Sequence, residues 1–201
     1  MEKLGTVFIL CLLVVVMSMG HANSQESNAE KIWFKNICRG KENLIKLHFY
    51  VQDALGGPNA TVWQVAEAAV TANSLTSFGQ VRVLDDLITV GRNRSSEALG
   101  RAQGLITSAD LSESALAMNM NFYFSAGKYN GSTLCILGRN PINENDRELS
   151  VVGGTGDFRM ARGYAISNTY SYDPVANYDV LEYTVYVTVY EKSGYTGVAM
   201  I

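Results

Sequence analysis

The stretch Leu181-Glu182-Tyr183-Thr184-Val185-Tyr186-Val187-Thr188-Val189-Tyr190 carries the clearest structural signal in the chain. Its odd positions hold Leu, Tyr and Val, whereas its even positions hold Glu, Thr and Tyr. This alternation of β-branched and aromatic residues predicts a β-strand with one buried face. A strand of about a dozen residues is long for a flat sheet, so it belongs in a sheet that curves or closes on itself.

The same period of two occurs near the other end of the chain. Ile45, Leu47, Phe49 and Val51 alternate with Lys46, His48, Tyr50 and Gln52, and Asp53 ends the run. Further apolar runs follow between turn residues, which predicts additional strands at 61–71, 78–90, 99–107, 116–126, 132–137, 147–152, 158–170 and 178–191. The Ala and Glu content of 61–71 also suits a helix, but its flanking turns favour a strand.

These strands predict an all-β fold. Eight or nine antiparallel strands in one domain, with no helix to cover a sheet face, favour a closed barrel because closure removes exposed strand edges. A two-sheet sandwich is the alternative. Barrels of about eight strands can hold one small ligand, so the fold itself suggests a pocket.

The amino-terminal segment is typical of a secreted precursor. Lys3 precedes an apolar run at 7–17, which is shorter than the roughly 20 residues that span a bilayer, and small residues surround Ala22. We expect residues 1–22 to be a cleaved signal peptide, with a signal anchor as the alternative. The expected remainder is an N-terminal lead at 23–44, a barrel domain at 45–192 and a tail at 193–201.

Secretion gives meaning to three N-x-S/T sequons. Asn59, Asn93 and Asn130 each begin such a triplet, and each lies between strand-like runs, so we expect N-glycosylation at two or more of them. Beyond the signal peptide only Cys38 and Cys135 remain, which allows one disulfide whose geometry the sequence does not reveal.

Composition narrows the classes of function. The net charge is −3 and basic residues do not cluster, which argues against nucleic acid and anionic membranes as partners. Beyond the expected signal peptide, one histidine, His48, and two cysteines are too few for a Cys/His zinc site. There is also no G-x-S-x-G motif to accompany a serine-histidine-acid triad, and we expect no metal or cofactor.

A glycine-rich segment stands out in the second half of the chain. Ser150-Val151-Val152-Gly153-Gly154-Thr155-Gly156-Asp157-Phe158 is followed by Arg162-Gly163. The glycines either form a tight connection or place a charged pair at a chosen position. No helix is expected after them, which argues against a phosphate-binding loop.

Several blocks together resemble the plant dirigent protein family. They are Leu47-His48-Phe49-Tyr50-Val51-Gln52-Asp53, Val83-Leu84-Asp85-Asp86-Leu87-Ile88-Thr89, Gly100-Arg101-Ala102-Gln103-Gly104 and the segment from Leu149 to Phe158 with Ala161-Arg162-Gly163. The blocks occur in the family's order and cover about residues 44–191.

The resemblance implies an eight-stranded antiparallel barrel of the allene oxide cyclase-like kind, assembled as a homo-oligomer, a trimer or a dimer, and secreted to the apoplast. It implies a role in the stereoselective coupling of monolignol-type phenoxy radicals into lignan-type products, with a laccase or peroxidase as oxidase and no oxidase activity of its own. The alternatives are a dehydratase or cyclase of the pterocarpan-forming type, which acts through a quinone methide, and a non-catalytic protein of cell wall or defence.

The resemblance also implies a set of pocket residues. Asp53, Asp157 and Arg162 are the expected catalytic groups, with Phe49 as a wall residue and Asp86 as a further candidate. A carboxylic acid in an apolar pocket stays protonated near neutral pH and can donate a proton to a quinone-methide oxygen. Because Asp157 and Arg162 are an odd number of residues apart, sharing a pocket requires a turn or bulge at Asp157.

Three positions depart from the family's pattern. Leu105-Ile106-Thr107-Ser108 stands where lignan-forming members carry aromatic residues, and Val180-Leu181 stands where an aromatic pocket residue is expected. Tyr190-Glu191-Lys192 lacks the family's usual cysteine. These differences predict a pocket of another shape and leave the substrate and the handedness of the product open.

Overall fold

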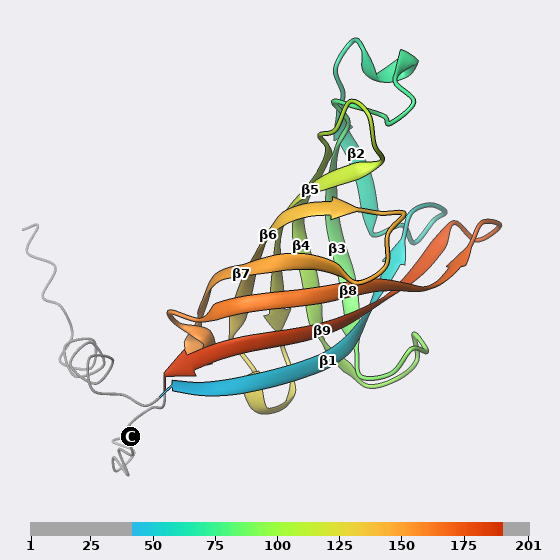
Figure 1. Cartoon of the computed structure of the whole chain (residues 1–201). Helices are drawn as coiled ribbons and strands as arrows, with labels where there is room; N and C mark the ends of the chain where they lie inside the picture. The colour runs from blue at the N-terminus through green and yellow to red at the C-terminus, as the bar shows by residue number, and fades with distance from the viewer. Residues whose placement is uncertain (1–41, 191–201) are drawn as a thin grey trace, which may run out of the picture. The chain divides into compact units, whose positions relative to one another are not determined.

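The structure, a computed structural model, describes residues 42–190, and strands built from the alternating segments form more than half of this range (Figure 1). The strands are β1 (Glu42–Ala54), β2 (Val62–Ala66), β3 (Val81–Thr89), β4 (Ala98–Ser108), β5 (Ala115–Phe124), β6 (Thr133–Pro141), β7 (Arg147–Thr155), β8 (Arg162–Asp173) and β9 (Tyr178–Tyr190). Three single turns of 3₁₀ helix accompany them: η1 (Thr71–Asn73), η2 (Gly127–Tyr129) and η3 (Gly156–Phe158).

The sheet closes into an antiparallel barrel of eight strands. The strand order is β1-β9-β8-β7-β6-β5-β4-β3, and β1 pairs with β3 through Tyr50 and Thr89 to complete the circle. Figure 1 shows β1 and β9 side by side, and they pair over their whole lengths. The short strand β2 adds to β3 beyond the part that β1 covers. The barrel, and not the sandwich, is therefore the fold.

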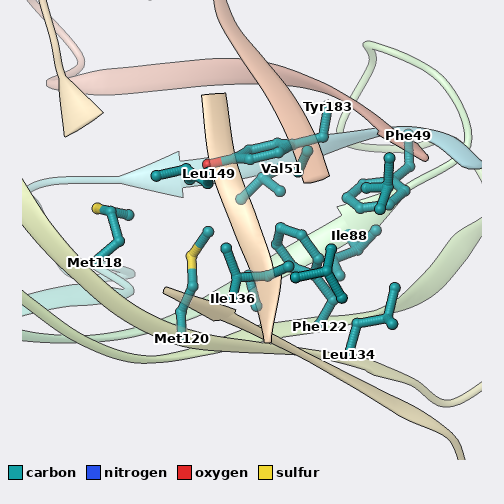
Figure 2. Packing of buried hydrophobic residues seen from close by; sticks show 14 of the residues in the cluster. Phe49, Val51, Ile88, Met118, Met120, Phe122, Leu134, Ile136, Leu149 and Tyr183 are labelled. Atoms are coloured by element: carbon teal, nitrogen blue, oxygen red, sulfur yellow. The ribbon is translucent and has the colours of Figure 1, made fainter. Parts of the chain in front are cut away.

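The apolar phase of each strand points inward and fills the barrel. Tyr183, Val185 and Val187 of β9 are at most 1% exposed, as the alternation in that stretch predicts. Figure 2 shows Phe49 beside Phe122, with Met118 further away along the barrel interior. The rings of Phe49 and Phe122 meet edge to face, with centroids 5.0 Å apart. This aromatic cluster closes the middle of the barrel.

The two ends of the barrel differ. The loops β1–β2, β2–β3, β4–β5, β6–β7 and β8–β9 lie at one end, which we call the cavity end. The loops β3–β4, β5–β6 and β7–β8, together with Glu42 and Tyr190, lie at the opposite end. Because β3, β7 and β9 each follow a loop at the cavity end, the first residues of these strands lie near that end.

The structure refines several strand limits. The segment 61–71 is a strand, but only Val62–Ala66 pairs, and β1 begins at Glu42 rather than Ile45. The segment 158–170 begins as a strand only at Arg162, because Gly156, with φ +60°, starts the turn η3. A Cβ atom at Gly156 would lie 2.5 Å from Ser132 Oγ, so both the backbone and the space favour glycine there.

Some predictions fall on residues outside 42–190. These are the signal peptide at 1–22, most of the lead at 23–44, Cys38 and the tail at 193–201. Within the described range, Cys135 is a free thiol. Asn59, Asn93 and Asn130 are exposed in loops, which leaves room for glycans. Residues 42–190 contain no helix long and apolar enough to cross a membrane.

Candidate functional site

A cavity of about 400 Å³ lies inside the barrel toward the cavity end. Its apolar lining comes from every side and consists of Val51, Leu55, Leu84, Ala102, Ile106, Leu116, Met118, Met120, Phe122, Ile142 and Leu181. Its polar lining consists of Asp53, Arg82, Asp86, Asn140, Asn143, Arg147, Thr169, Tyr172, Asp179 and Tyr183. A largely apolar hollow with a few convergent polar groups is typical of a small-molecule site.

Three carboxyl groups lie side by side on adjacent strands. Asp53 of β1 stands opposite Asp179 of β9 in the sheet register. On its other side the β1–β3 register, continued by one residue beyond Gln52 and Leu87, places Asp53 opposite Asp86. Directly opposed residues in antiparallel strands have Cβ atoms about 4.5–5.5 Å apart. We call Asp86, Asp53 and Asp179 the carboxyl row.

Burial is the largest cause of the raised pKa values of the three carboxyls in this row. Burial, followed by the charges of Asp86 and Asp179, raises the pKa of Asp53 to about 8, and the charge of Arg82 opposes this rise. Burial also raises the pKa of Asp86 to about 7, against the hydrogen bond from Thr61. The pKa of Asp179 is raised by burial and opposed by the charge of Arg147. Neighbouring carboxyls that resist double ionisation share a proton near neutral pH.

Thr61 holds Asp86 from the connection between β1 and β2. Its hydroxyl donates to Asp86 Oδ1 at 2.5 Å, while the backbone N–H of Ala54 donates to Thr61 Oγ1 at 3.1 Å. The loop thereby fixes the carboxyl end of Asp86. Since a hydroxyl donor stabilises the ionised form, Asp86 is better suited than Asp53 to carry the negative charge of the pair.

Arg147 faces the row from β7. Its Nη1 donates to the backbone carbonyls of Ile142 and Glu144, at 3.1 and 3.0 Å. Its Nη2 donates to Thr169 Oγ1 at 3.2 Å and lies 3.4 Å from Ser167 Oγ. These contacts fix the plane of the guanidinium group. Burial lowers the pKa of Arg147, but an arginine remains charged at this depth.

Four buried polar atoms without a hydrogen-bond partner gather at this site. They are Asp53 Oδ1, Asn140 Oδ1, Arg147 Nε and Asp179 Oδ1, and no other buried side-chain nitrogen or oxygen of residues 42–190 lacks a partner. All four residues line the cavity. Buried polar atoms are nearly always paired, so this concentration marks the place where a polar ligand completes the network.

We expect the substitution Asp53→Asn to stabilise the fold near pH 8. The Asp53 carboxyl has a pKa near 4 in an unfolded chain, whereas burial raises its pKa to about 8 in the fold. Its contribution to stability is thus complete below about pH 4 and is lost as the pH rises through about 8. Asn does not ionise. The melting temperature of the variant should therefore equal that of the wild type at pH 4 and exceed it at pH 8, by about 2–4 °C per kcal/mol. A higher wild-type value at pH 8 would contradict the burial of this carboxyl.

Only some of the residues predicted from the sequence line the cavity. Asp53 and Asp86 line the cavity, and Asp85 points outward to Arg101, as strand alternation requires. Phe49 is not a wall residue: it is 1% exposed, stacks on Tyr183 and packs behind the cavity lining. The inward phase of β1 places Phe49 four residues deeper in the barrel than Asp53.

The expectation that Asp157 and Arg162 share the pocket is wrong. Neither residue lines the cavity. Asp157 lies in η3 and Arg162 begins β8, so both are at the opposite end. Arg162 Nη2 instead donates to both carboxylate oxygens of the exposed Glu42, at 2.7 and 2.8 Å. The glycines do form a turn at Asp157, but the direction of β7 carries that turn away from the cavity.

Sequence reasoning missed Asn140, Arg147 and Asp179. The sequence does contain a sign of them, because each of the three is a polar residue at a position where the alternation of its strand places apolar residues. Asp179 is in phase with Leu181 and Tyr183, as Arg147 is with Leu149 and Val151, and Asn140 with Leu134 and Ile136. A polar residue in the inward phase of a barrel strand must face the interior. Among residues 42–190 no group of three or more His, Cys, Asp and Glu side chains is arranged to hold a metal ion.

Comparison with known sequences identifies related proteins over almost the whole chain. The model of the dirigent-like protein family matches residues 44–188. Dirigent protein 11 of Arabidopsis thaliana is 47% identical over 189 residues, which cover 92% of this chain and 96% of that protein. Pterocarpan synthase 1 of Glycyrrhiza echinata is 44% identical over 192 residues, which cover 94% of this chain and 100% of that protein.

Solved structures show the same barrel. The pterocarpan synthase dirigent protein GePTS1 superimposes with a TM-score of 0.69 at 44% identity, over 75% of this chain and 87% of that one. The pterocarpan synthase dirigent protein PsPTS1 gives a TM-score of 0.68 at 43% identity, over 74% of this chain and 97% of that one. The fold of this chain is thus the fold of these two solved dirigent proteins.

Proposed function

The chain belongs to the dirigent-like protein family, and from this premise we propose that its cavity converts a phenol with a benzylic hydroxyl group into a cyclic ether through a quinone methide. The carboxyl row carries this proposal: it offers protonated and ionised carboxyls side by side in an apolar cavity. Relatives named pterocarpan synthase, at 44% and 42% identity, support the same class of reaction.

The first step is loss of water. Asp53 donates its proton to the benzylic hydroxyl group, the C–O bond breaks, and water leaves. The benzylic carbon, which has lost the C–O electron pair with the water, receives an electron pair from the ring. The ring is supplied in turn by the phenol oxygen, whose proton passes to the ionised Asp86. The product is a neutral quinone methide. Because Thr61 stabilises the Asp86 carboxylate and Asp53 has no such donor, this division of roles follows the contacts of the two acids.

The second step closes the ring. A second phenol oxygen of the same molecule adds to the exocyclic carbon of the quinone methide and forms the new C–O bond. Its proton passes to Asp53, while Asp86 returns a proton to the quinone-methide oxygen. Both carboxyls are then restored, and the net change is the loss of one water with no oxidation. The reaction therefore needs no redox partner.

Arg147 and the apolar walls orient the substrate in this scheme. Arg147, whose Nη1 and Nη2 groups have protein partners, offers Nε toward a substrate oxygen. Met118, Met120 and Phe122 line the cavity opposite polar groups on β1 and β9, so a flat aromatic ring has an apolar surface to lie on. Holding the intermediate in one orientation is what makes addition from one face preferred.

The direct test is conversion without an oxidant. The purified protein is incubated with an isoflavanol-like benzylic alcohol in the absence of laccase and peroxidase, and the products are separated on a chiral column. We expect an optically active cyclic ether at a rate well above the protein-free reaction. A rate equal to that of the protein-free control across a panel of such alcohols would sink the proposal.

We expect the reaction to have a narrow, bell-shaped pH profile. The working pair needs one ionised and one protonated carboxyl. Burial raises the pKa of Asp86 to about 7 and that of Asp53 to about 8. The value of kcat/KM should therefore rise through about pH 7, as Asp86 ionises, and fall above about pH 8, as Asp53 loses its proton. The substitution Asp86→Asn should lower the rate, because Asp86 accepts the phenol proton, and should remove the acid limb from the activity that remains. For the wild type, a profile flat from pH 5 to 9 would contradict the shared proton.

Stereoselective coupling of phenoxy radicals is the second candidate. The apolar share of the lining favours it, because monolignol radicals are flat and neutral and two rings could lie against Met118, Met120 and Phe122. A laccase or peroxidase would supply the radicals, and the coupling bond itself forms without a proton from the protein. Chiral chromatography of products from a monolignol and laccase, with and without this chain, separates the two candidates.

The proposal also covers the location, the glycosylation and the assembly of the protein. We propose a secreted, apoplastic glycoprotein that acts as a homo-oligomer on phenolic small molecules. The exposed positions of Asn59, Asn93 and Asn130 support glycosylation, since each side chain lies in a loop that a glycan can extend from. All three loops lie outside the barrel interior, so glycans leave the lining itself unaltered.

A further inference from the structure

Arg82 is a charged residue of the cavity that the proposed reaction does not use. It lies on the inward phase of β3, two residues before Leu84 and four before Asp86, all of which line the cavity. Four residues along a strand span about 13 Å, so Arg82 stands closer to the cavity end than the carboxyl row does. The side chain is partly buried, and burial lowers the pKa of its guanidinium, which nevertheless stays charged.

A chain of amides orients Arg82. Its Nε donates to Gln80 Oε1 at 2.5 Å. Gln80 Nε2 in turn donates to Gln64 Oε1 at 2.7 Å, and Gln64 Nε2 donates to Glu67 Oε2 at 2.6 Å. These contacts hold one edge of the guanidinium against β2. Arg82 forms no ion pair in the part of the chain between 42 and 190, so its charge is available to a ligand in the cavity that it lines.

The nearby carboxyl does not neutralise this charge. Arg82 opposes the rise in the pKa of Asp53, but burial and the two other carboxyls prevail and raise that pKa to about 8. At neutral pH Asp53 is therefore mostly protonated. The lining then holds two arginines against Asp86 and Asp179, which leaves the Arg82 side of the cavity free to receive an anion.

The strand order places Arg82 far from the other arginine. Around the eight strands of the closed barrel, β3 and β7 are four steps apart in either direction. Arg82 and Arg147 thus stand on opposite walls, with Asp53 and Asp179 on two of the strands between them and Asp86 on the same strand as Arg82. A substrate that reaches across the cavity meets a guanidinium at each end. Arginine is suited to such a role because its N–H fork binds carboxylate oxygens in pairs.

We propose that Arg82 forms a second recognition subsite, which selects phenolic substrates that carry a carboxylate at the end remote from Arg147. This inference rests on the proposed function, because it assumes that the cavity binds phenolic molecules. It names the chemical class that this chain prefers among them. The subsite recognises the substrate and takes no part in moving protons.

Matched ligands test the subsite directly. Isothermal titration calorimetry at pH 7 compares a 4-hydroxycinnamic acid with its methyl ester, which has the same ring and phenol but no charge. We expect the wild-type protein to bind the acid about tenfold more tightly than the ester. In Arg82→Met, which keeps an unbranched apolar stem but removes the guanidinium group, the preference should fall below about twofold while the affinity for the ester is kept. Arg82→Lys should keep part of the preference.

A control variant separates local from overall charge. Lys128→Met removes one positive charge from the exposed turn η2 at the opposite end and should leave the preference for the acid unchanged. Equal binding of acid and ester by the wild type, or a full preference for the acid in Arg82→Met, would overturn the subsite while the cavity proposal stands. If the wild type binds neither ligand, the proposed function and this inference both fall.

Discussion

Replacing Asp53 by Asn will lower the rate of the proposed cyclisation by about 10²–10⁴-fold, the usual contribution of a general acid. Asn keeps the size of the side chain but carries no transferable acidic proton. Its neighbours Asp86 and Asp179 lie one strand away on either side, in a cavity that the substitution does not enlarge. The measurement is kcat/KM for loss of the benzylic alcohol at pH 7.5, with KM expected to change little.

Asp157→Asn is the matched comparison for this substitution. Both changes replace one carboxyl by an amide of nearly the same size, but Asp157 lies in η3 at the opposite end of the barrel. Its backbone N–H donates to Ser132 Oγ at 3.0 Å, a contact that Asn can keep. We expect activity within about twofold of the wild type. If Asp157→Asn and not Asp53→Asn abolished conversion, the assignment of the acid to the cavity would be wrong.

Alternation along single strands was sufficient to predict the barrel. A period of two is a local property, so residues 178–191 and 45–53 reveal their buried faces without knowledge of their partners. Closure followed because no helix was expected to cover a face. What alternation does not contain is the pairing of strands, which decides that β1 closes on β3 and that β2 merely extends it.

The candidate site was predictable only in part, for the same reason. Asp53 and Asp86 lie in blocks that resemble a family, and Asp53 continues the inward phase of β1. Asp157 and Arg162 lie in an equally recognisable block, yet their strands carry them to the other end. Which end a residue reaches depends on strand direction and length along the whole barrel. A block's resemblance therefore identifies the scaffold more reliably than it identifies the cavity.

The buried carboxyls that give the site its chemistry also lower the stability of the fold. Burial raises the pKa values of Asp53, Asp86 and Asp179, and four buried polar atoms lack a partner, so these groups oppose folding. The aromatic cluster around Phe49 and Tyr183 offsets this cost deeper in the barrel. The substitution Asp53→Asn is therefore expected to raise the stability near pH 8 and to lower the activity.

Arg147→Met will reduce both stability and activity. The guanidinium holds the carbonyls of Ile142 and Glu144 in the β6–β7 connection, and the substitution leaves these acceptors without their donor. Breaking a buried, charged hydrogen-bond network costs about 3–5 kcal/mol, which corresponds to a melting temperature lower by roughly 10 °C. We expect kcat/KM to fall by about 100-fold, because Nε no longer faces the substrate and the charge that opposes the rise in the pKa of Asp179 is gone.

A double-mutant cycle separates the two effects of Arg147. Asp179→Asn removes the carboxylate that Arg147 faces, so the loss of activity in the double variant should be smaller than the product of the single losses if the two side chains act together. Arg147→Lys keeps a charge but lacks the fork that reaches Ile142 and Thr169 at once, so it should recover less than a tenth of the lost activity. Full recovery by Lys would mean that charge alone matters, and purely multiplicative losses would separate Arg147 from the carboxyl row.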